Sequence, residues 1–196
     1  MIEDLRNHSV LKNRISRALY EKTRHEVLYT NDVSRSTSAS SVLFLMGGDC
    51  YDGCSEKAPC VIFNKRSLRV KQPGDLCFPG GRISPRLDSF LSKFLALPFS
   101  PLTRWAYWRR WHEKNAQESQ RLSLLLATSL RESFEEMRLN PLCIDFLGPM
   151  PSQDLGMFRR VLYPMVVWVN RQSRFLPNWE VEKIVRVPLE RLMKPE

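Results

Sequence analysis

The pattern of apolar and polar residues along the chain predicts both helices and strands. Residues 1–27 space their apolar side chains three to four positions apart, as in an amphipathic helix; these side chains are Leu5, Val10, Leu11, Ile15, Leu19 and Tyr20. Short apolar runs, typical of buried strands, follow at 41–46, 60–63, 144–147 and 161–169. Pro164 inside the last run indicates an edge strand or a bulge. A Ser/Thr-rich linker is predicted at 31–41, a loop at 47–59, and a short terminal helix beginning within 188–192.

A further helix is predicted around residues 126–139. At about 100° per residue, a single narrow stripe should be buried; it contains Leu126, Leu130, Phe134 and Met137. Glu132, Glu135 and Glu136 project from the opposite side. Three carboxylates on one turn repel one another, and a hard cation such as Mg²⁺ or Mn²⁺ would reverse that cost. Taken alone, the same pattern also fits an acidic, solvated helix face.

Composition limits the class of protein without selecting a function. With 196 residues, of which 43% are apolar, the chain can bury one sizeable core. Its net charge of +9 favours encounters with anions, whether phosphometabolites, nucleic acid or membrane surfaces. No apolar run reaches the ~20 residues needed to span a bilayer, so no transmembrane segment is predicted.

The cysteines point to a reducing compartment. There are five of them, an odd number, and the first residues contain no apolar signal core. We therefore expect an intracellular protein, cytoplasmic or mitochondrial. Cys50, Cys54 and Cys60 cluster in a loop, but no fourth ligand follows at a zinc-site spacing, so free thiols are expected.

A glycine-rich turn lies upstream of the acidic helix. Residues 73–82 read Pro-Gly-Asp-Leu-Cys-Phe-Pro-Gly-Gly-Arg, and glycine permits close approach of another group to the backbone. Together with Arg131-Glu132-x-x-Glu135-Glu136, this turn resembles the box of the Nudix hydrolases. The resemblance implies an α/β fold, an α/β/α sandwich with a mixed sheet, and divalent metal used to cleave a diphosphate linkage.

The resemblance to the Nudix box includes departures. Leu87 stands where the first Glu of the box is expected, and Asp88 is the candidate substitute with a one-residue slip. Ser133 replaces an apolar residue, and Arg138 replaces the glycine at the helix exit. Because a non-glycine residue in the left-handed conformation costs about 1–2 kcal/mol, the exit is expected to shift to Asn140.

Two further stretches are similar to the coenzyme A pyrophosphatase-like branch of the family. One is the strand and basic turn at 60–67 followed by Phe-Pro-Gly-Gly at 78–81. The other is the segment 177–189, which begins Pro-Asn and ends Val-Pro-Leu. The resemblance implies cleavage of coenzyme A or an acyl derivative, with a phosphorylated small molecule as the partner.

The box is interrupted by an insert at about residues 87–121, since Gly81 and Glu132 are 51 positions apart. Residues 89–118 are rich in aromatic and basic side chains, with Trp105, Trp108 and Trp111 at helical spacing. This stripe is expected either to pack on its own domain or to serve as a surface for a protein partner or a homodimer. A substrate lid and a nucleic-acid platform are further alternatives. We therefore predict residues 1–40 as an N-terminal helix and linker, and 41–196 as a Nudix domain with an aromatic-rich helical insert.

The resemblance assigns roles to particular residues. Metal would be held by Glu132, Glu135 and Glu136, with Glu132 or Glu136 as the base and Arg131 fixing a carboxylate. Glu180 or Glu182 could add a distal ligand. Substrate phosphates would meet the residues around the glycine-rich turn, namely Arg66, Gly80, Gly81 and Arg82. Two alternatives remain: a scaffold with weakened catalysis in a basic, possibly ribonucleoprotein, assembly, and a hydrolase of capped RNA or nucleotide diphosphates.

Overall fold

The computed structural model describes residues 7–24, 29, 38–48, 58–114, 116–156, 160–170, 172 and 174–193. The helices in these ranges are α2 (His8–Thr23), α3 (Pro85–Phe94), α4 (Trp108–Lys114), α5 (Ala116–Met137) and α6 (Leu189–Met193), with a 3-10 turn, η1, at Pro141–Cys143. The strands are β1 (Ala39–Gly47), β2 (Cys60–Arg66), β3 (Leu76–Cys77), β4 (Gly80–Arg82), β5 (Ile144–Pro149), β6 (Gln153–Leu155), β7 (Arg160–Val169) and β8 (Val181–Pro188). No helix in the described part of the chain is long and apolar enough to cross a membrane.

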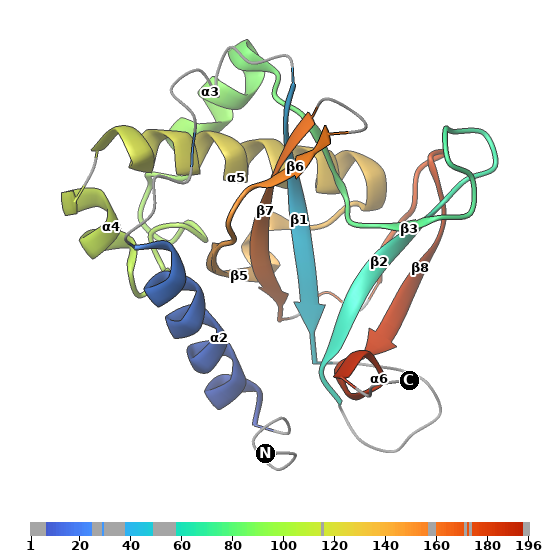
Figure 1. Cartoon of the computed structure of the whole chain (residues 1–196), viewed down its shortest axis with the longest axis horizontal. Coiled ribbons are helices and arrows are strands. Elements are labelled where there is room, and N and C mark those ends of the chain that lie inside the picture. Colours follow the sequence, from blue (N-terminus) through green and yellow to red (C-terminus); the bar gives the residue numbers. More distant parts are fainter. Residues whose placement is uncertain are drawn as a thin grey trace.

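The described strands form one mixed sheet. Its main path runs β3-β2-β1-β7-β5, while β8 pairs with β2, β4 with β1, and β6 with β7. β1 and β7 are parallel, and the other pairs are antiparallel. Figure 1 shows α5 crossing the strands with α3 beside it, and α2 lying apart from both. The predicted α/β class with a mixed sheet and helices is confirmed.

Alternation along β1 and β7 divides the core between the two faces of the sheet, as expected from the period of two in strands. One cluster contains Leu43, Leu45 and the apolar side of α5. The other contains Phe44, Met46 and the apolar side of α2. The sheet is therefore packed between α2 and α5, as the predicted sandwich requires.

Of the two alternatives predicted at Pro164, an edge strand or a bulge, the edge strand is wrong. β7 is not an edge strand, because it lies between β1 and β5. Pro164 sits where the antiparallel partner changes: β5 pairs up to Met165, and β6 takes over at Leu162. Pro164 therefore lies at the gap between the residues of β7 that pair with β5 and those that pair with β6. Proline has no N–H to donate to a neighbouring strand, and this lack costs least at such a gap. The predicted loop at 47–59 lies largely outside the described residues.

The acidic helix is longer than predicted and is buried over more of its surface. Leu126, Leu130 and Met137 are buried as expected, but Phe134 is 46% exposed, so the predicted stripe is wrong at that position. Ser133 is fully buried, and its Oγ donates to the carbonyl of Ser129 at 2.6 Å. A polar side chain is tolerated in this apolar setting because it bonds to its own helix.

The helix exit also differs from expectation. Arg138, not Asn140, takes the left-handed conformation, with φ of 56°. Its N–H donates to the Phe134 carbonyl at 3.0 Å, and its guanidinium lies 4.9 Å from the centre of the Phe134 ring. Gln172 donates to the Arg138 carbonyl at 2.8 Å. These contacts offset the backbone cost, while Asn140 remains extended and caps η1 through a bond from the Leu142 N–H.

The aromatic insert is only partly helical, since residues 95–107 between α3 and α4 form turns, and two of its tryptophans pack inside the molecule. Trp105 and Trp111 are 4% and 7% exposed, and the Trp105 indole N–H donates to Ser16 of α2 at 3.0 Å. Tyr107 stacks on Tyr20 of α2, with ring centres 4.3 Å apart. The interpretation that the stripe packs on its own chain holds for these residues. Exposed aromatic side chains of the insert lie instead in and after α3, at Phe90, Phe94 and Phe99.

Candidate functional site

The glycine-rich turn and the acidic helix meet at one place in the fold. β4 pairs antiparallel with β1, which brings Gly80 and Gly81 onto the last turns of α5. The Gly80 N–H donates to Oε1 of Glu136 at 3.3 Å. A side chain on Gly81 would collide with the Glu132 carboxyl, and one on Gly80 would collide with the β1 backbone. Glycine is needed at Gly80 because its backbone lies against that of β1, whereas at Gly81 the flexible end of the Glu132 side chain would have to shift.

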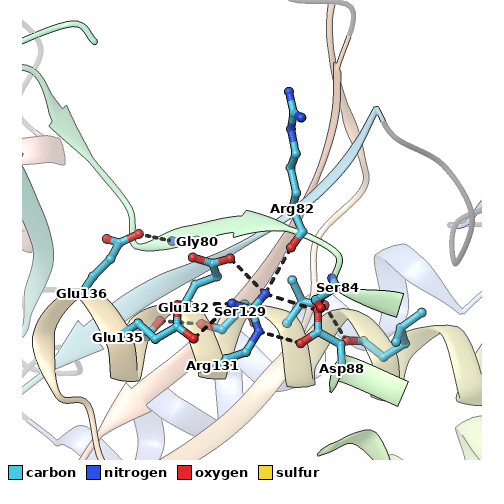
Figure 2. Close-up of polar contacts among 12 residues, drawn as sticks. Gly80, Arg82, Ser84, Asp88, Ser129, Arg131, Glu132, Glu135 and Glu136 are labelled. Atoms are coloured by element: carbon cyan, nitrogen blue, oxygen red, sulfur yellow. Dashed lines mark hydrogen bonds and ion pairs between the residues drawn. The ribbon is translucent and has the colours of Figure 1, made fainter. Parts of the chain in front are cut away.

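Arg131 contacts several of the acidic side chains at this junction (Figure 2). Its guanidinium donates to Asp88 at 2.7 Å and lies 2.9 Å from Glu132 and 3.3 Å from Glu135. It also donates to the Arg82 carbonyl at 3.2 Å. Arg131 therefore ties β4, α3 and α5 together and orients two of the three helix carboxylates.

Asp88, the predicted substitute for the first acidic residue of the box, lies next to Arg131 in the fold. It is fully buried on α3 and accepts hydrogen bonds from the Ser84 N–H at 2.7 Å and the Thr128 hydroxyl at 2.9 Å. With Arg131 as its third partner, each carboxylate oxygen is satisfied. A buried carboxylate is stable only with partners of this kind. Its neighbour Leu87 is 45% exposed, so of these two residues at the start of α3 only Asp88 points into the molecule.

Glu136 lies deeper than its neighbours on the helix. Burial raises the pKa of this carboxyl to about 7, against the opposing effect of hydrogen bonds from Gly80 and from the Asn64 amide. The Asn64 Nδ2 donates to Glu136 Oε2 at 2.7 Å. Burial also raises the pKa of Glu132, with Arg131 opposing it. Glu135 is mostly solvated, with a side chain that is 51% exposed.

Asn64 is a residue that the sequence analysis did not single out. It is fully buried on β2, and its Oδ1 has no hydrogen-bond partner among the described residues. The signal was present, because Asn64 follows Ile62 on the same strand face and places an amide in an apolar position. A buried amide needs a partner, and Glu136 supplies one for the nitrogen.

The C-terminal segment closes the end of the acidic helix. The N–H groups of Leu176 and Asn178 donate to the carbonyls of Met137 and Glu136 at 3.0 and 2.8 Å. Helix C-termini leave such carbonyls without intrahelical partners. Glu180, three positions after Pro177, lies close enough to Glu136 for its charge to act on that carboxyl. Glu182 instead pairs with Lys65 at 2.9 Å.

The remaining predicted substrate contacts divide into two kinds. Gly80 and Gly81 lie at the carboxylates, whereas the Arg82 side chain is exposed and points away from them in Figure 2. Arg66 donates from Nε to the Lys71 carbonyl at 2.8 Å and lies beside Cys77. Arg66 is therefore engaged in holding the basic turn.

The carboxylates at this junction are candidates for binding a divalent metal. Within the described ranges, no three His, Cys, Asp or Glu side chains form a ready-made metal cluster. Glu132 and Glu136 nevertheless suit a hard cation, which prefers carboxylate oxygens. Burial makes both carboxylates costly to ionise, and a bound cation would lower that cost. Next to them lies the unpartnered Oδ1 of Asn64. A cation at this position would offset the charge that the fold has buried.

No family model and no curated protein matches the sequence. Similar solved structures include a Nudix hydrolase from Alicyclobacillus acidocaldarius, 14% identical over 80% of this chain and 81% of that chain, with a TM-score of 0.49. Another is RenU, a Nudix hydrolase from M. smegmatis, 13% identical over 79% and 72%, with a TM-score of 0.47. A C. elegans Ap4A hydrolase complex is 10% identical over 77% and 80%, with a TM-score of 0.46. These likenesses assign no substrate to this chain.

Proposed function

We propose that this chain is a divalent-metal-dependent hydrolase of the Nudix type that cleaves a diphosphate linkage in a nucleotide derivative. The observation that carries the proposal is the junction of Gly80 and Gly81 with Glu132 and Glu136. Gly81 and Glu132, which are 51 positions apart in the sequence, lie against each other there, as the resemblance to an interrupted box implied. The buried Asp88–Arg131 pair supports the proposal because Asp88 is the predicted substitute for the missing acidic member of the box.

The proposed metal is Mg²⁺ or Mn²⁺, held by Glu132 and Glu136 with Glu135 nearby. Such an ion, when bound, neutralises diphosphate charge and lowers the pKa of a coordinated water. Glu136 is the proposed base, since it lies deepest of the three helix carboxylates and accepts hydrogen bonds from Asn64 and Gly80 that hold it in place. Arg131 fixes the Glu132 rotamer, and the Asn64 amide with the Gly80 N–H fixes that of Glu136.

The proposed substrate is coenzyme A or an acyl derivative. Support comes from the sequence of the glycine-rich turn at 78–81 and of the segment at 177–189, both of which resemble the coenzyme A pyrophosphatase-like branch. In the fold, the second segment closes the C-terminus of the acidic helix. Two stretches far apart in sequence therefore flank the same carboxylates.

A fold retained as a scaffold is the second candidate. Arg131 bonds both Glu132 and Glu135, so two of the three helix carboxylates already have a cationic partner within the chain. In such a protein the carboxylates would hold α5 against β4 and α3, and turnover would be absent.

The experiment is incubation with Mg²⁺ or Mn²⁺ and a panel of coenzyme A, acetyl coenzyme A, ADP-ribose, diadenosine tetraphosphate and capped RNA. We expect metal-dependent cleavage, with coenzyme A as the preferred member, and loss of at least about 100-fold in Glu136→Gln if this residue is the base. Glu190→Gln, at an exposed position on α6, is the matched control. No metal-dependent turnover of any member would reject the enzyme and favour the scaffold. Preferential cleavage of capped RNA would reject only the coenzyme A assignment.

A further inference from the structure

An exposed apolar surface lies on the first part of the insert, on α3 and the turn that follows it. Its side chains are each at least 45% exposed, and we call them the apolar patch: Leu87, Phe90, Phe94, Leu97 and Phe99. On a helix, Leu87, Phe90 and Phe94 fall within one narrow stripe. The rings of Phe90 and Phe94 are in contact, with centres 5.1 Å apart. Exposed apolar side chains that cluster in this way, rather than occurring singly, mark an interaction surface.

The backbone that carries the apolar patch is fixed to the rest of the molecule. The opposite face of α3 is tied to α5 by the ion pair between Asp88 and Arg131. In the turn after α3, the Leu97 carbonyl accepts from the Ser100 N–H at 3.2 Å and from the Thr103 hydroxyl at 3.0 Å. The exposed rings therefore belong to a well-bonded part of the fold, which presents them to solvent in a defined arrangement.

Phe99 is the most exposed member of the apolar patch, at 83%. Its φ is 70°, in the left-handed region that residues with a Cβ rarely adopt. A phenyl ring in water also forgoes the gain from burial. The chain thus bears two costs at one position, and such costs cluster where a residue has a function. A ring that becomes buried on binding would account for both.

The apolar patch continues into a hollow between α3 and α5. The hollow has a volume of about 270 Å³ and is lined by Phe94 of the patch together with Leu130 and Phe134 of α5. Apart from Arg131, its lining side chains are apolar. The Phe134 side chain is itself largely exposed. A partner that covers the patch can therefore bury apolar surface of α5 as well as of α3.

The charge beside the apolar patch is positive. Arg86 and Lys93 are exposed on α3 and lie next to the apolar stripe on the helix. No ion pair among the described residues engages either of them. The only acid in residues 85–107 is Asp88, which is completely buried, and Glu135 on the adjoining α5 is paired with Arg131. A complementary partner therefore combines apolar groups with negative charge.

We propose that the apolar patch docks the protein onto the surface of an anionic phospholipid bilayer. Phe and Leu side chains enter the boundary between headgroups and acyl chains, while the adjoining Arg86 and Lys93 are attracted to the negative headgroups. A bilayer accepts the outstanding Phe99 ring without a pocket of matching shape. Docking of this kind requires no catalysis, so its test is independent of the hydrolase proposal.

Other anionic partners fit the apolar patch less well. Nucleic acid is bound through stacking on aromatic rings and through contacts with phosphates, and Leu87 and Leu97 contribute to neither. A folded protein partner would have to cover Lys93, and lysine is depleted in protein interfaces. Both remain outcomes that the experiment can detect.

The experiment is sedimentation of the full chain with vesicles of two compositions, phosphatidylcholine alone and an equimolar mixture of phosphatidylcholine and phosphatidylserine. One double variant, Phe90→Ala/Phe99→Ala, removes two exposed rings. The other, Arg86→Gln/Lys93→Gln, removes the two adjoining charges. Because all four side chains are exposed, the variants should fold as the wild type does, and circular dichroism and the melting temperature check this.

Matched controls come from the basic turn after β2, where exposed apolar and cationic residues also adjoin. Leu68→Ala removes a side chain that is about as exposed as Phe99. Arg69→Gln/Lys71→Gln removes two exposed charges, the same number as Arg86→Gln/Lys93→Gln. The controls therefore separate the apolar patch from exposed apolar residues and positive charge in general.

We expect the wild type to bind the mixed vesicles and to bind phosphatidylcholine at least about 10-fold more weakly. Phe90→Ala/Phe99→Ala should weaken binding to the mixed vesicles at least about 10-fold. Arg86→Gln/Lys93→Gln should weaken it about 10- to 30-fold, with no change on phosphatidylcholine. Both control variants should bind within about 3-fold of the wild type.

Several results would overturn the docking surface. Absence of vesicle binding by the wild type would do so, as would equal weakening by Arg69→Gln/Lys71→Gln, since net charge alone would then attract the vesicles. A wild-type dimer that dissociates in Phe90→Ala/Phe99→Ala, without vesicle binding, would assign the patch to a second copy of the chain. Binding of single-stranded RNA that the same variant loses, again without vesicle binding, would assign it to nucleic acid. Sedimentation velocity and fluorescence anisotropy measure these two alternatives.

Discussion

Arg131 and Asp88 are 43 positions apart in the sequence and form a buried ion pair, with Arg131 Nε 2.7 Å from Asp88 Oδ1. Asp88 is completely buried, and the Arg131 side chain is 11% exposed. The pair fixes the start of α3, where the insert begins, to the C-terminal half of α5, so the insert does not separate the two halves of the site.

Removing Asp88 should destabilise the protein. Asp88→Ala leaves the Arg131 guanidinium buried with Glu132 and Glu135 as remaining partners, and we expect a loss of about 3 kcal/mol in the free energy of unfolding. Urea denaturation measures it, with Asp154→Asn at an exposed position of β6 as the control. A loss equal to that of the control would show that the pair contributes nothing to stability.

Because of Glu136, the free energy of unfolding should fall as pH rises. Its pKa is raised from 4.5 to about 7 by burial, so the folded state favours the protonated form. The stabilisation is complete below the unfolded pKa and is lost as pH rises through about 7. Between pH 4.5 and 8, the wild type should lose stability relative to Glu136→Gln, which keeps an uncharged side chain of the same size. Parallel stability curves for the two proteins would contradict the raised pKa.

Mg²⁺ should oppose the loss of stability that ionisation of Glu136 causes. Above pH 7, where Glu136 is ionised, the ion should raise the melting temperature of the wild type, because a ligand that binds only the folded state stabilises it by mass action. The Glu132→Gln/Glu136→Gln double variant should show no such increase, and Glu182→Gln should respond as the wild type does. Equal increases in all three proteins would locate metal binding elsewhere.

Arg138→Gly should be more stable than Arg138→Ala. Both variants lose the contact with the Phe134 ring, but only glycine relieves the left-handed backbone, which costs other residues about 1–2 kcal/mol. Relative to the wild type, the glycine variant should gain up to about 1 kcal/mol, since the cation–π contact at an exposed site is worth about 0.5–1 kcal/mol. Urea denaturation of the three proteins checks the order, and a more stable alanine variant would refute it.

The ion pair between Lys12 and Asp145 should hold α2 to the sheet in a pH-dependent way. Burial favours the protonated acid, but the bonds from Lys12 and Asn170 outweigh it and lower the pKa of Asp145. The stabilisation is present above the unfolded pKa, near 3.9, and is lost as pH falls through the lower folded value. Lys12→Met should therefore be less stable than the wild type at pH 7, and the difference should shrink towards pH 2. A constant difference would mean that the lysine acts through packing.

Much of the fold was predictable from the chain, because its signals are local. Strands β1, β2, β5 and β7 were predicted with their ends shifted by a few residues, since buried apolar runs mark them directly. β3, β4 and β6 are two or three residues long and carry no period of their own. They exist because their neighbours in space offer ladder hydrogen bonds, which no short sequence window contains.

The candidate site likewise combines features that local sequence predicts with features that depend on the tertiary fold. The sequence by itself determined the three carboxylates, the adjacent Arg131 and the glycines of the turn, since these are fixed by residue type and helical spacing. Only the tertiary structure decided that Asp88 is buried against Arg131, that Asn64 holds Glu136, and that Arg138 can carry a positive φ. Each of these depends on burial and on partners from distant elements, because the free energy of a buried polar group or a strained residue is set by what the fold places beside it.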